Sequence, residues 1–264
     1  MRCFGAAARS TDRLREVSGL AQRDDFIRRI RIALGRPLDH TLSRAGALAP
    51  ASTLAGVLPP VPTGEVLAKF EAELAKVAGV AHRAGNRQEL EEILRVILSQ
   101  ANARNVVLSR NPLLTELNIA AQLRSIGMNV AAWPASAERE VSQSSLPTFA
   151  EASFAAAVGI TGVEYALAET GSLVTASWTE GAQLASLAPP VHVALYRRTQ
   201  LVATLDEVLE RLRASYAPRE AVWGRSVVFI TGTSRTADIE QILIRGVHGP
   251  GEVHAILVEA ECFA

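Results

Sequence analysis

Residues 86–133, NRQELEEILRVILSQANARNVVLSRNPLLTELNIAAQLRSIGMNVAAW, contain the pattern that determines the fold class predicted for this chain. Apolar residues recur at helical spacing over residues 86–100 and again over 112–126. Each of these helical stripes is followed by a short apolar run, Asn105–Ser109 after the first and Met128–Trp133 after the second. Helices that alternate with short apolar strands are typical of a mainly parallel sheet covered on both faces.

The same alternation continues on both sides of this stretch, from Thr63 onward. Further helices are expected at about 64–78, 204–216 and 237–245. Further strands are expected at 173–177, 191–196, 226–230 and 253–258. We therefore predict one α/β domain over residues 63–264, with a mainly parallel sheet and flanking helices.

Residues 1–62 differ in composition, and we assign them to an N-terminal helical arm and a linker. Residues 1–36 carry nine Arg, and the part from Asp24 to Gly35 predicts an amphipathic helix with one apolar stripe, formed by Phe26, Ile30, Ala33 and Leu34. This helix could dock a partner or nucleic acid, or it could pack on the protein's own body with its Arg face in solvent; we favour packing. Residues 38–62 are rich in Ala, Pro, Ser and Thr, which predicts a surface linker.

The composition excludes several classes of function. Lys+Arg and Asp+Glu both number 27, so the chain has no overall charge that would favour nucleic acid or a membrane surface. Aromatic residues make up 5%, too few for a platform on which bases stack. We therefore expect no nucleic-acid partner.

The two cysteines, Cys3 and Cys262, stand at opposite ends of the chain and cannot build a zinc or iron–sulfur site. We expect no metal and no cofactor held by this chain. The start of the sequence lacks the apolar core of a signal peptide, and Pro50, Pro59, Pro60 and Pro62 interrupt the longest uncharged stretch. These features predict a soluble, cytoplasmic protein without a membrane span.

The segment from Val158 to Thr175 is the first candidate for chemistry. Glu164 and Glu169 lie among small and apolar residues, where an unpaired carboxylate would be costly. Five residues separate them, so they do not converge on one face of a strand or helix. Glu169 is the candidate catalytic residue, because the turn Thr170-Gly171-Ser172 that follows it could offer hydroxyls and amides to a ligand. Glu169 could equally be a structural carboxylate that accepts from nearby backbone amides.

The segment from Val228 to Pro250 is the second candidate. A strand ends at Ile230, and the expected helix that follows would present free amides at its start, which form an anion site. Arg235 would add a forked donor for a carboxylate or phosphate. Asp238 could instead form a local ion pair with that guanidinium. The ligand-binding residues predicted here are Gly232, Thr233, Ser234, Arg235, Thr236 and Asp238.

His248 lies in the loop Gly246–Pro250 and is the second candidate catalytic residue, since an unperturbed imidazole titrates near neutral pH. It could instead cap the end of the expected helix. His254 lies in an apolar strand and is expected in the core. Ligands of open α/β sheets bind beyond the carboxyl ends of the strands, so we expect both candidate segments at that edge.

The nucleotide-binding and hydrolase motifs with a known mechanism are absent from this sequence. There is no Gly-x-Gly-x-x-Gly after a strand and no Gly-x-x-x-x-Gly-Lys-Ser/Thr. There is also no Gly-x-Ser-x-Gly elbow. Rossmann dinucleotide binding, P-loop nucleotide hydrolysis and serine hydrolase chemistry therefore have no support.

Taken together, Gly159–Val174, Thr231–Glu240 and Gly246–Pro250 resemble the LUD domain of the lactate-utilisation protein C family (LutC/YkgG-like, formerly DUF162). The helix Ile27–Arg36 is similar to the leading helix of that family, so the resemblance runs from about residue 24 to 260. Glu164 departs from the family pattern, which has Asp or a small residue there. Thr233 also departs, because the family often has Pro at that position.

The resemblance implies a fold of the sugar-isomerase and CoA-transferase-like (NagB/RpiA/CoA-transferase) group. It also implies a three-component system that oxidises L-lactate to pyruvate, with the iron–sulfur clusters in cysteine-rich and iron–sulfur partner proteins. The favoured hypothesis is a subunit of this system that binds a small carboxylate, another anion or a partner at the loops of Glu169 and Arg235. The alternatives are a non-catalytic binding or assembly module, and a stand-alone CoA-transferase- or isomerase-like enzyme with Glu169 as base or nucleophile.

Overall fold

The computed structural model describes residues 61–133, 145–216, 226–237 and 243–263, and a few helical positions between Asp25 and Ala33. Contacts divide the chain into two units, Met1–Pro60 and Val61–Ala264. In the first unit, Asp25 pairs with Arg29 at 2.8 Å, one helical turn apart. Most of the expected arm and linker, with Cys3, lies outside the described residues.

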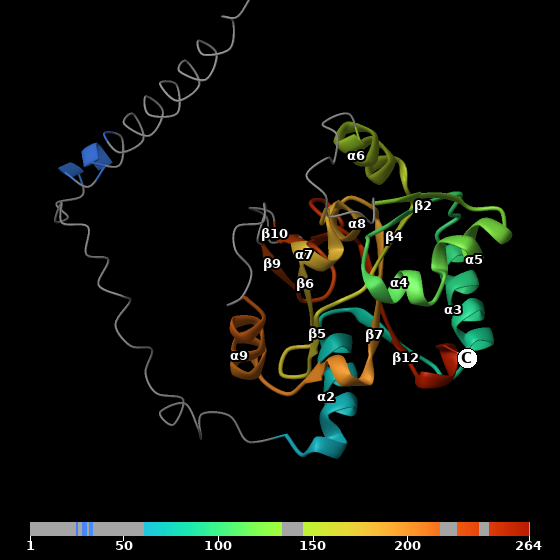
Figure 1. Ribbon diagram of the computed structural model, residues 1–264, viewed down its shortest axis with the longest axis horizontal. Helices are drawn as coiled ribbons and strands as arrows, with labels where there is room; N and C mark the ends of the chain where they lie inside the picture. The colour runs from blue at the N-terminus through green and yellow to red at the C-terminus, as the bar shows by residue number, and fades with distance from the viewer. Residues whose placement is uncertain are drawn as a thin grey trace, which may run out of the picture. The chain divides into compact units, whose positions relative to one another are not determined.

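A six-stranded sheet forms the centre of the second unit (Figure 1). All of its neighbouring strands pair in parallel, which confirms the predicted α/β class with a parallel sheet. In spatial order the strands are β1 (Gly79–Ala84), β12 (Glu252–Val258), β7 (Val191–Arg197), β4 (Val158–Thr161), β2 (Asn105–Leu108) and β3 (Asn129–Ala132).

Side chains of the central strands alternate between two apolar layers. In β7, Val193 and Leu195 belong to one layer, while Ala194 and Tyr196 belong to the other. Because side chains of a strand alternate between faces, both faces of the sheet are covered. The first layer is closed by α3 (Arg87–Gln100), α4 (Pro112–Glu116), α5 (Ile119–Ser125) and the short η4 (Ala260–Phe263).

The second face is covered by α2 (Val66–Lys76), which follows η2 (Thr63–Glu65), and by a second sheet. The strands of that sheet, in order, are β8 (Leu201–Val202), β5 (Tyr165–Leu167), β6 (Ser172–Ala176) and β9 (Val227–Ile230). Leu173 of β6 faces the parallel sheet, and Val174 faces α9 (Leu205–Tyr216). Figure 1 accordingly shows α9 on one side of the central strands and α3 with α5 on the other.

Two expected strands, at 173–177 and 226–230, therefore do not join the parallel sheet. They form β6 and β9, which pair with each other antiparallel in the second sheet. Strands β1, β4, β5 and β8 were not anticipated. The edge strand β1 carries His82 and Arg83, and β5 and β8 are very short, so none of the three gives a clear apolar run.

The single helix expected over 112–126 is divided into α4 and α5. Asn118 between them adopts a left-handed backbone, with φ of 55°, and this conformation interrupts an α-helix. The side chain of Asn111 caps α4 by accepting from the backbone N–H of Leu113 at 3.0 Å, and Pro112 occupies the first helical position.

The helix expected over 237–245 is wrong at both of its ends. Arg235–Ala237 forms β10 and Leu243–Arg245 forms β11, and the two strands pair antiparallel. At the base of this hairpin the N–H of Ser234 donates to Pro250 and the N–H of Gly246 donates to Ser234. The N–H of Ser234 is therefore used by the loop and is not free to form an anion site.

The remaining elements connect the two sheets and cover β2 and β4. They are α6 (Ser145–Ala155), α7 (Ser177–Glu180), α8 (Leu184–Leu187) and η3 (Arg198–Gln200). Among the described residues, none of the helices combines the length and the apolar character that crossing a membrane requires.

Candidate functional site

The order of the parallel strands creates a topological switch point between β2 and β4. After β2 the chain continues to β3 on the outer side of the sheet, whereas after β4 it continues to β7 on the other side. The two strands are direct neighbours, with Leu108 opposite Ile160 near their carboxyl ends. Ligands of open α/β sheets bind in the crevice that such diverging connections leave open.

A buried carboxylate lies at this switch point. Glu180, the last residue of α7, is 1% exposed. Its Oε2 accepts from the hydroxyl of Ser109 at 2.5 Å and from the backbone N–H of Gly162 at 3.2 Å. Its Oε1 accepts from the side-chain amide of Asn111. Three donors from the segments after β2 and β4 therefore converge on one carboxylate, and we call Ser109, Asn111 and Gly162 the donor cradle.

Local sequence explains why the cradle closes around Glu180. A β-carbon at Gly162 would lie 2.2 Å from Cγ of Asn111, so only glycine allows that side chain to approach. A β-carbon at Gly181 would lie 2.2 Å from Cδ1 of Trp133, the residue after β3. Gly181 has φ of 77°, which ends α7 directly after Glu180.

Burial dominates the electrostatics of the site. It raises the pKa of Glu180 to about 7, against the opposing effect of the hydrogen bonds from Ser109 and Asn111. The nearby carboxylate of Glu164 raises this pKa further, and the N–H of Gly162 lowers it. A carboxyl group with this pKa is present both with and without its proton near neutral pH, as acid–base and proton-linked sites require.

Charged neighbours of the cradle are held by polar contacts. Glu164 is half-buried and accepts from the hydroxyl of Thr179. The guanidinium of Arg110 donates to the backbone oxygen of Trp178 at 3.1 Å. The backbone N–H of Arg110 donates to the backbone oxygen of Glu180, also at 3.1 Å. These bonds fix α7 against the segment that follows β2.

The residues predicted from the first segment form a turn on α2. Oε2 of Glu169 accepts from the backbone N–H of Leu205 at 2.8 Å, at the start of α9. The hydroxyls of Thr170 and Ser172 are 2.6 Å apart. Gly171 has φ of 66°, and a β-carbon there would lie 2.2 Å from the backbone nitrogen of Leu74.

The second predicted segment meets the first through one hydrogen bond, between Ser172 and Thr231 at 2.7 Å. Gly232 has φ of 73°, and a β-carbon there would lie 2.1 Å from the backbone oxygen of Val77, which precedes β1. The loop of Ser234 and Pro250 precedes β12. The expectation that both segments lie at the carboxyl edge of the parallel sheet holds only for the part of the first segment that directly follows β4, which contains Gly162 and Glu164. It is wrong for the turn after Glu169, which lies at α2, and for the second segment, which lies at the amino ends of β1 and β12.

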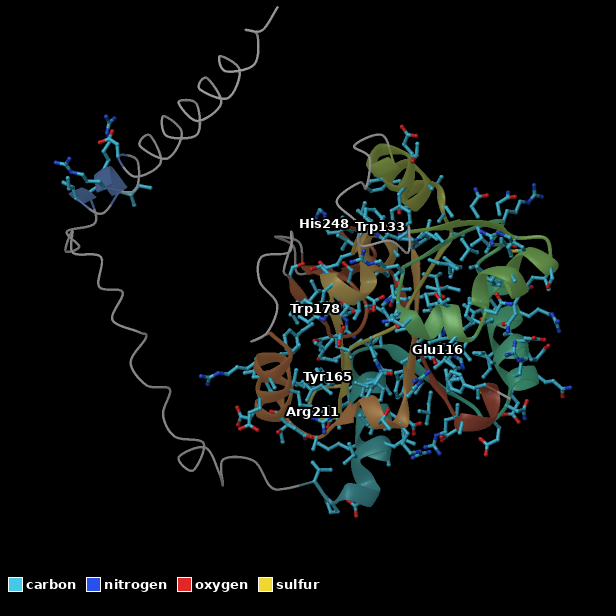
Figure 2. All side chains as sticks on the ribbon, in the orientation of Figure 1. Glu116, Trp133, Tyr165, Trp178, Arg211 and His248 are labelled. Carbon is cyan, nitrogen blue, oxygen red and sulfur yellow. The ribbon has the colours of Figure 1, made fainter. Side chains whose placement is uncertain are left out.

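The other predicted site residues do not gather around Glu169. Arg235 and His248 are exposed, and Thr233 is buried with a hydroxyl that has no hydrogen-bond partner in the described part of the chain. Figure 2 shows His248 well away from Tyr165 and Arg211, where the second sheet meets α9. Asp238 lies outside the described residues, as does the side chain of Thr236.

Three histidines on the parallel sheet lie outside the predicted site residues. Burial lowers the pKa of His192 to about 3, so this imidazole is neutral, and Nε2 lies 2.9 Å from the hydroxyl of Thr161. His82 and His254 stack and share a hydrogen bond of 3.0 Å. Burial lowers the pKa of both. The 7% exposure of His254 agrees with its expected place in the core.

Metal ligands do not cluster in the described ranges, which contain no group of three or more His, Cys, Asp or Glu that could hold an ion. The thiol of Cys262 is buried and donates to the backbone oxygen of Ala84 at 3.3 Å. Burial raises the pKa of this thiol, which makes it a poor ligand and nucleophile.

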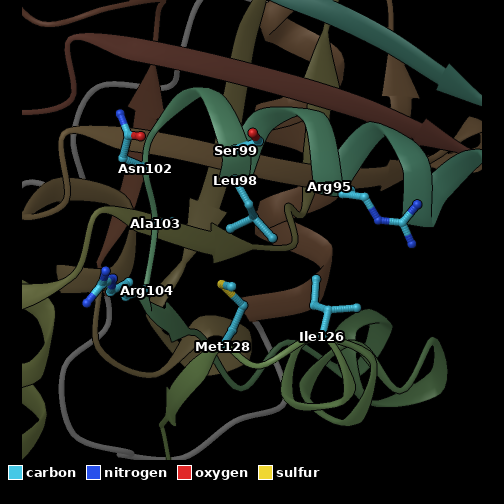
Figure 3. A pocket seen from close by; sticks show the side chains of 8 residues that line it. All are labelled: Arg95, Leu98, Ser99, Asn102, Ala103, Arg104, Ile126 and Met128. Atoms are coloured by element: carbon cyan, nitrogen blue, oxygen red, sulfur yellow. The ribbon is translucent and has the colours of Figure 1, made fainter.

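A surface depression of about 480 Å³ lies near the amino ends of β2 and β3, whereas the cradle lies at the carboxyl ends of β2 and β4. Figure 3 shows the side chains that line this depression. It is bounded by the C-terminal part of α3 and by the residues that precede β2 and β3. Leu98, Ile126 and Met128 form its apolar part. Arg95 at its rim pairs with Glu92 at 2.7 Å. Because it lies at the amino ends of the strands, we do not assign the chemistry to it.

The fold and the cradle define an α/β protein with a polar site at a topological switch point. Residues 67–258 match the family model of the LUD domain, and the chain belongs to the LUD-domain family. A solved structure of a DUF162 family protein from Deinococcus radiodurans has the same fold, with a TM-score of 0.53 and 23% identity. That similarity covers 75% of this chain and 99% of the other.

Several relatives have a higher sequence identity to this chain over the part that aligns. Lactate utilization protein C of Halalkalibacterium halodurans is 31% identical over 171 residues, which cover 64% of this chain and 69% of the relative. Lactate utilization protein C of Deinococcus radiodurans is 36% identical over 100 residues, covering 38% and 45%. The uncharacterized protein YkgG of Escherichia coli is 30% identical over 157 residues, covering 59% and 63%. The family resemblance expected from the sequence is thus confirmed.

The donor cradle was missed by the reasoning from sequence. Ser109 and Asn111 stand directly after a buried strand, and this signal could have marked them as residues at the carboxyl edge. Glu180 carries no comparable signal, because it is 71 residues from Ser109 in sequence and lies in a four-residue helix.

Proposed function

We propose that this protein works in the utilisation of L-lactate, as one of three proteins that together oxidise L-lactate to pyruvate. The observation that carries the proposal is the LUD-domain match over residues 67–258, together with relatives named lactate utilization protein C. Fold similarity alone would be a poor ground for function, so the sequence relationship has the greater weight.

Within such a system the iron–sulfur clusters would belong to the cysteine-rich and iron–sulfur partner proteins. This chain has two cysteines in 264 residues, which is too few for a cluster site of its own. Its task would be to bind a small anion or a partner through the loops of Glu169 and Arg235. The exposed guanidinium of Arg235 is the available donor, while Glu169 anchors its loop to α9.

The test is L-lactate-dependent reduction of a redox dye by the two partner proteins, with and without this chain. We expect full activity only in the three-protein mixture. Arg235→Ala should lower that activity and Arg235→Lys should restore part of it, since lysine keeps the charge but loses the fork. Equal activity of the two partners without this chain would refute the proposal.

A non-catalytic assembly module is the second candidate. Leu187 and Val247 are 54% and 51% exposed, and Leu187 lies close to Gly249 in the loop of Val247. Exposed apolar side chains of this kind are typical of contacts with another protein. If Leu187→Asp abolishes co-purification with the partners while Arg235→Ala leaves dye reduction unchanged, assembly is the function of this face.

A further inference from the structure

We propose that the donor cradle of Ser109, Asn111 and Gly162 is a binding site for a small monocarboxylate, and that the carboxylate of Glu180 occupies it as an internal plug. The inference rests on the proposed function for the identity of the natural ligand, which would be L-lactate or its 2-oxo product. The site itself rests on the geometry of the switch point.

The donors of the cradle are arranged for a carboxylate. The hydroxyl of Ser109 and the N–H of Gly162 share one oxygen, while the amide of Asn111 serves the other. Two of these residues follow β2 and one follows β4, so the cradle belongs to the strand ends that form the switch point. A free carboxylate in the same position would receive the same hydrogen bonds.

Glu180 itself comes from outside the strand ends. It is the last residue of α7, a helix of four residues, and Gly181 with φ of 77° follows it. The part of the Glu180 side chain beyond Cβ consists of Cγ, Cδ and two carboxylate oxygens, which are the same heavy atoms as those of acetate. Truncation at Cβ would therefore leave a space that matches acetate, with the donors still in place.

The charges around the plug make its hold dependent on protonation. Glu164 is the carboxylate that faces Glu180, and it disfavours a second negative charge. Arg110, which stands between Ser109 and Asn111 in sequence, donates from its guanidinium to the backbone oxygen of Trp178. In the cradle Glu180 keeps its proton up to about pH 7, whereas Glu180 displaced into water would ionise at its ordinary pKa of 4.5. Displacement of the plug therefore releases a proton between these two pH values, and a free carboxylate competes better for the three donors as the pH rises toward 7.

Chemical rescue tests the site directly. Glu180→Ala should bind acetate at least about tenfold more tightly than the wild type, because in the wild type the Glu180 carboxylate occupies the donor cradle in most molecules and competes with acetate. Acetate should raise the melting temperature of this variant in a concentration-dependent way. Acetamide, which is neutral and of the same shape, is the ligand control. Ser109→Ala in the same background is the control variant and should weaken the rescue.

The wild type gives a second test that does not depend on the folding of a variant. Its affinity for L-lactate, followed by calorimetry, should rise about tenfold for each pH unit between about pH 5 and pH 7 and then level off, since displacement of the plug releases one proton. Glu180→Gln should remove this pH dependence. Absence of acetate rescue in a folded Glu180→Ala variant, or an affinity of the wild type that does not change with pH, would overturn the proposal.

Failure of this inference and failure of the proposed function give different results. If acetate rescues Glu180→Ala but the three-protein mixture does not oxidise L-lactate, the carboxylate site stands and lactate oxidation is refuted. If the mixture oxidises L-lactate and acetate does not rescue the variant, the cradle is structural and the ligand binds elsewhere.

Discussion

Replacement of Glu180 by glutamine should change how the stability of the protein depends on pH. The raised pKa means that the folded protein binds the Glu180 proton more tightly than the unfolded chain does. The stabilisation linked to this proton is complete below about pH 4.5 and is lost as the pH rises to about 7. Glu180→Gln cannot lose a proton, so its stability lacks this contribution to the pH dependence.

The size of the effect follows from the two pKa values. The ordinary pKa of a glutamic acid side chain is 4.5, and the pKa of Glu180 in the folded protein is about 7. One pKa unit corresponds to about 1.4 kcal/mol, so the free energy of unfolding of the wild type should fall by about 3 kcal/mol relative to Glu180→Gln between pH 4.5 and pH 8. The amide also places an NH₂ group opposite the donor of Asn111, which adds a cost that does not depend on pH.

Urea denaturation of both proteins at several pH values measures this difference. The other titrating groups are common to both chains and cancel in the subtraction. The test is how the difference in the free energy of unfolding between the two proteins changes with pH, and not the size of that difference at one pH. Parallel stability curves for the two proteins would refute the assignment of a proton-binding carboxyl at the switch point.

Three further changes test other parts of the structure. Gly171→Ala should lower the free energy of unfolding by about 3 kcal/mol or more, because the new β-carbon would overlap the backbone of α2. Gly127 also has a positive φ but faces open space, so Gly127→Ala should lower it by only about 1–2 kcal/mol. Equal losses for the two variants in urea denaturation would contradict the close approach of Gly171 to α2. Glu169→Ala should cost about 1 kcal/mol through the lost cap of α9, and Glu169→Gln less, a ranking that thermal unfolding can check. Tyr196→Phe should change stability by less than about 1 kcal/mol, because its buried hydroxyl has no partner among the described residues, and a larger loss in calorimetry would reveal one.

The parallel sheet was predictable because its central strands are apolar on both faces. In β7 every residue from Val191 to Tyr196 is buried, so the run reads as a strand without alternation. The edge strand β1 was not predictable in the same way, because His82 and Arg83 interrupt it.

The hairpin of β10 and β11 shows where periodicity fails. The stretch from Ala237 to Arg245 spaces its apolar residues as a helix would, yet both ends of the stretch are strands. Antiparallel pairing and the bonds from Ser234 to Pro250 and from Gly246 to Ser234 outweigh the local preference. The free backbone amides that this helix would have offered to an anion are lost with it, whereas the guanidinium of Arg235 is exposed.

The candidate site was predictable only in part. The rule that ligands bind at the carboxyl ends of strands predicts the edge at which the cradle lies, but the strand order is needed to find the switch point between β2 and β4. Glu180 reaches that point from α7, through contacts between residues 18 to 71 positions apart in sequence. No local pattern contains this information.

Growth on L-lactate as the sole carbon source tests the central claim most directly. A strain from which this gene has been deleted should fail to grow on L-lactate and should grow normally on glucose, and the wild-type gene should restore growth on L-lactate. Growth of the deletion strain on L-lactate at the rate of its parent would contradict a role of this protein in lactate utilisation.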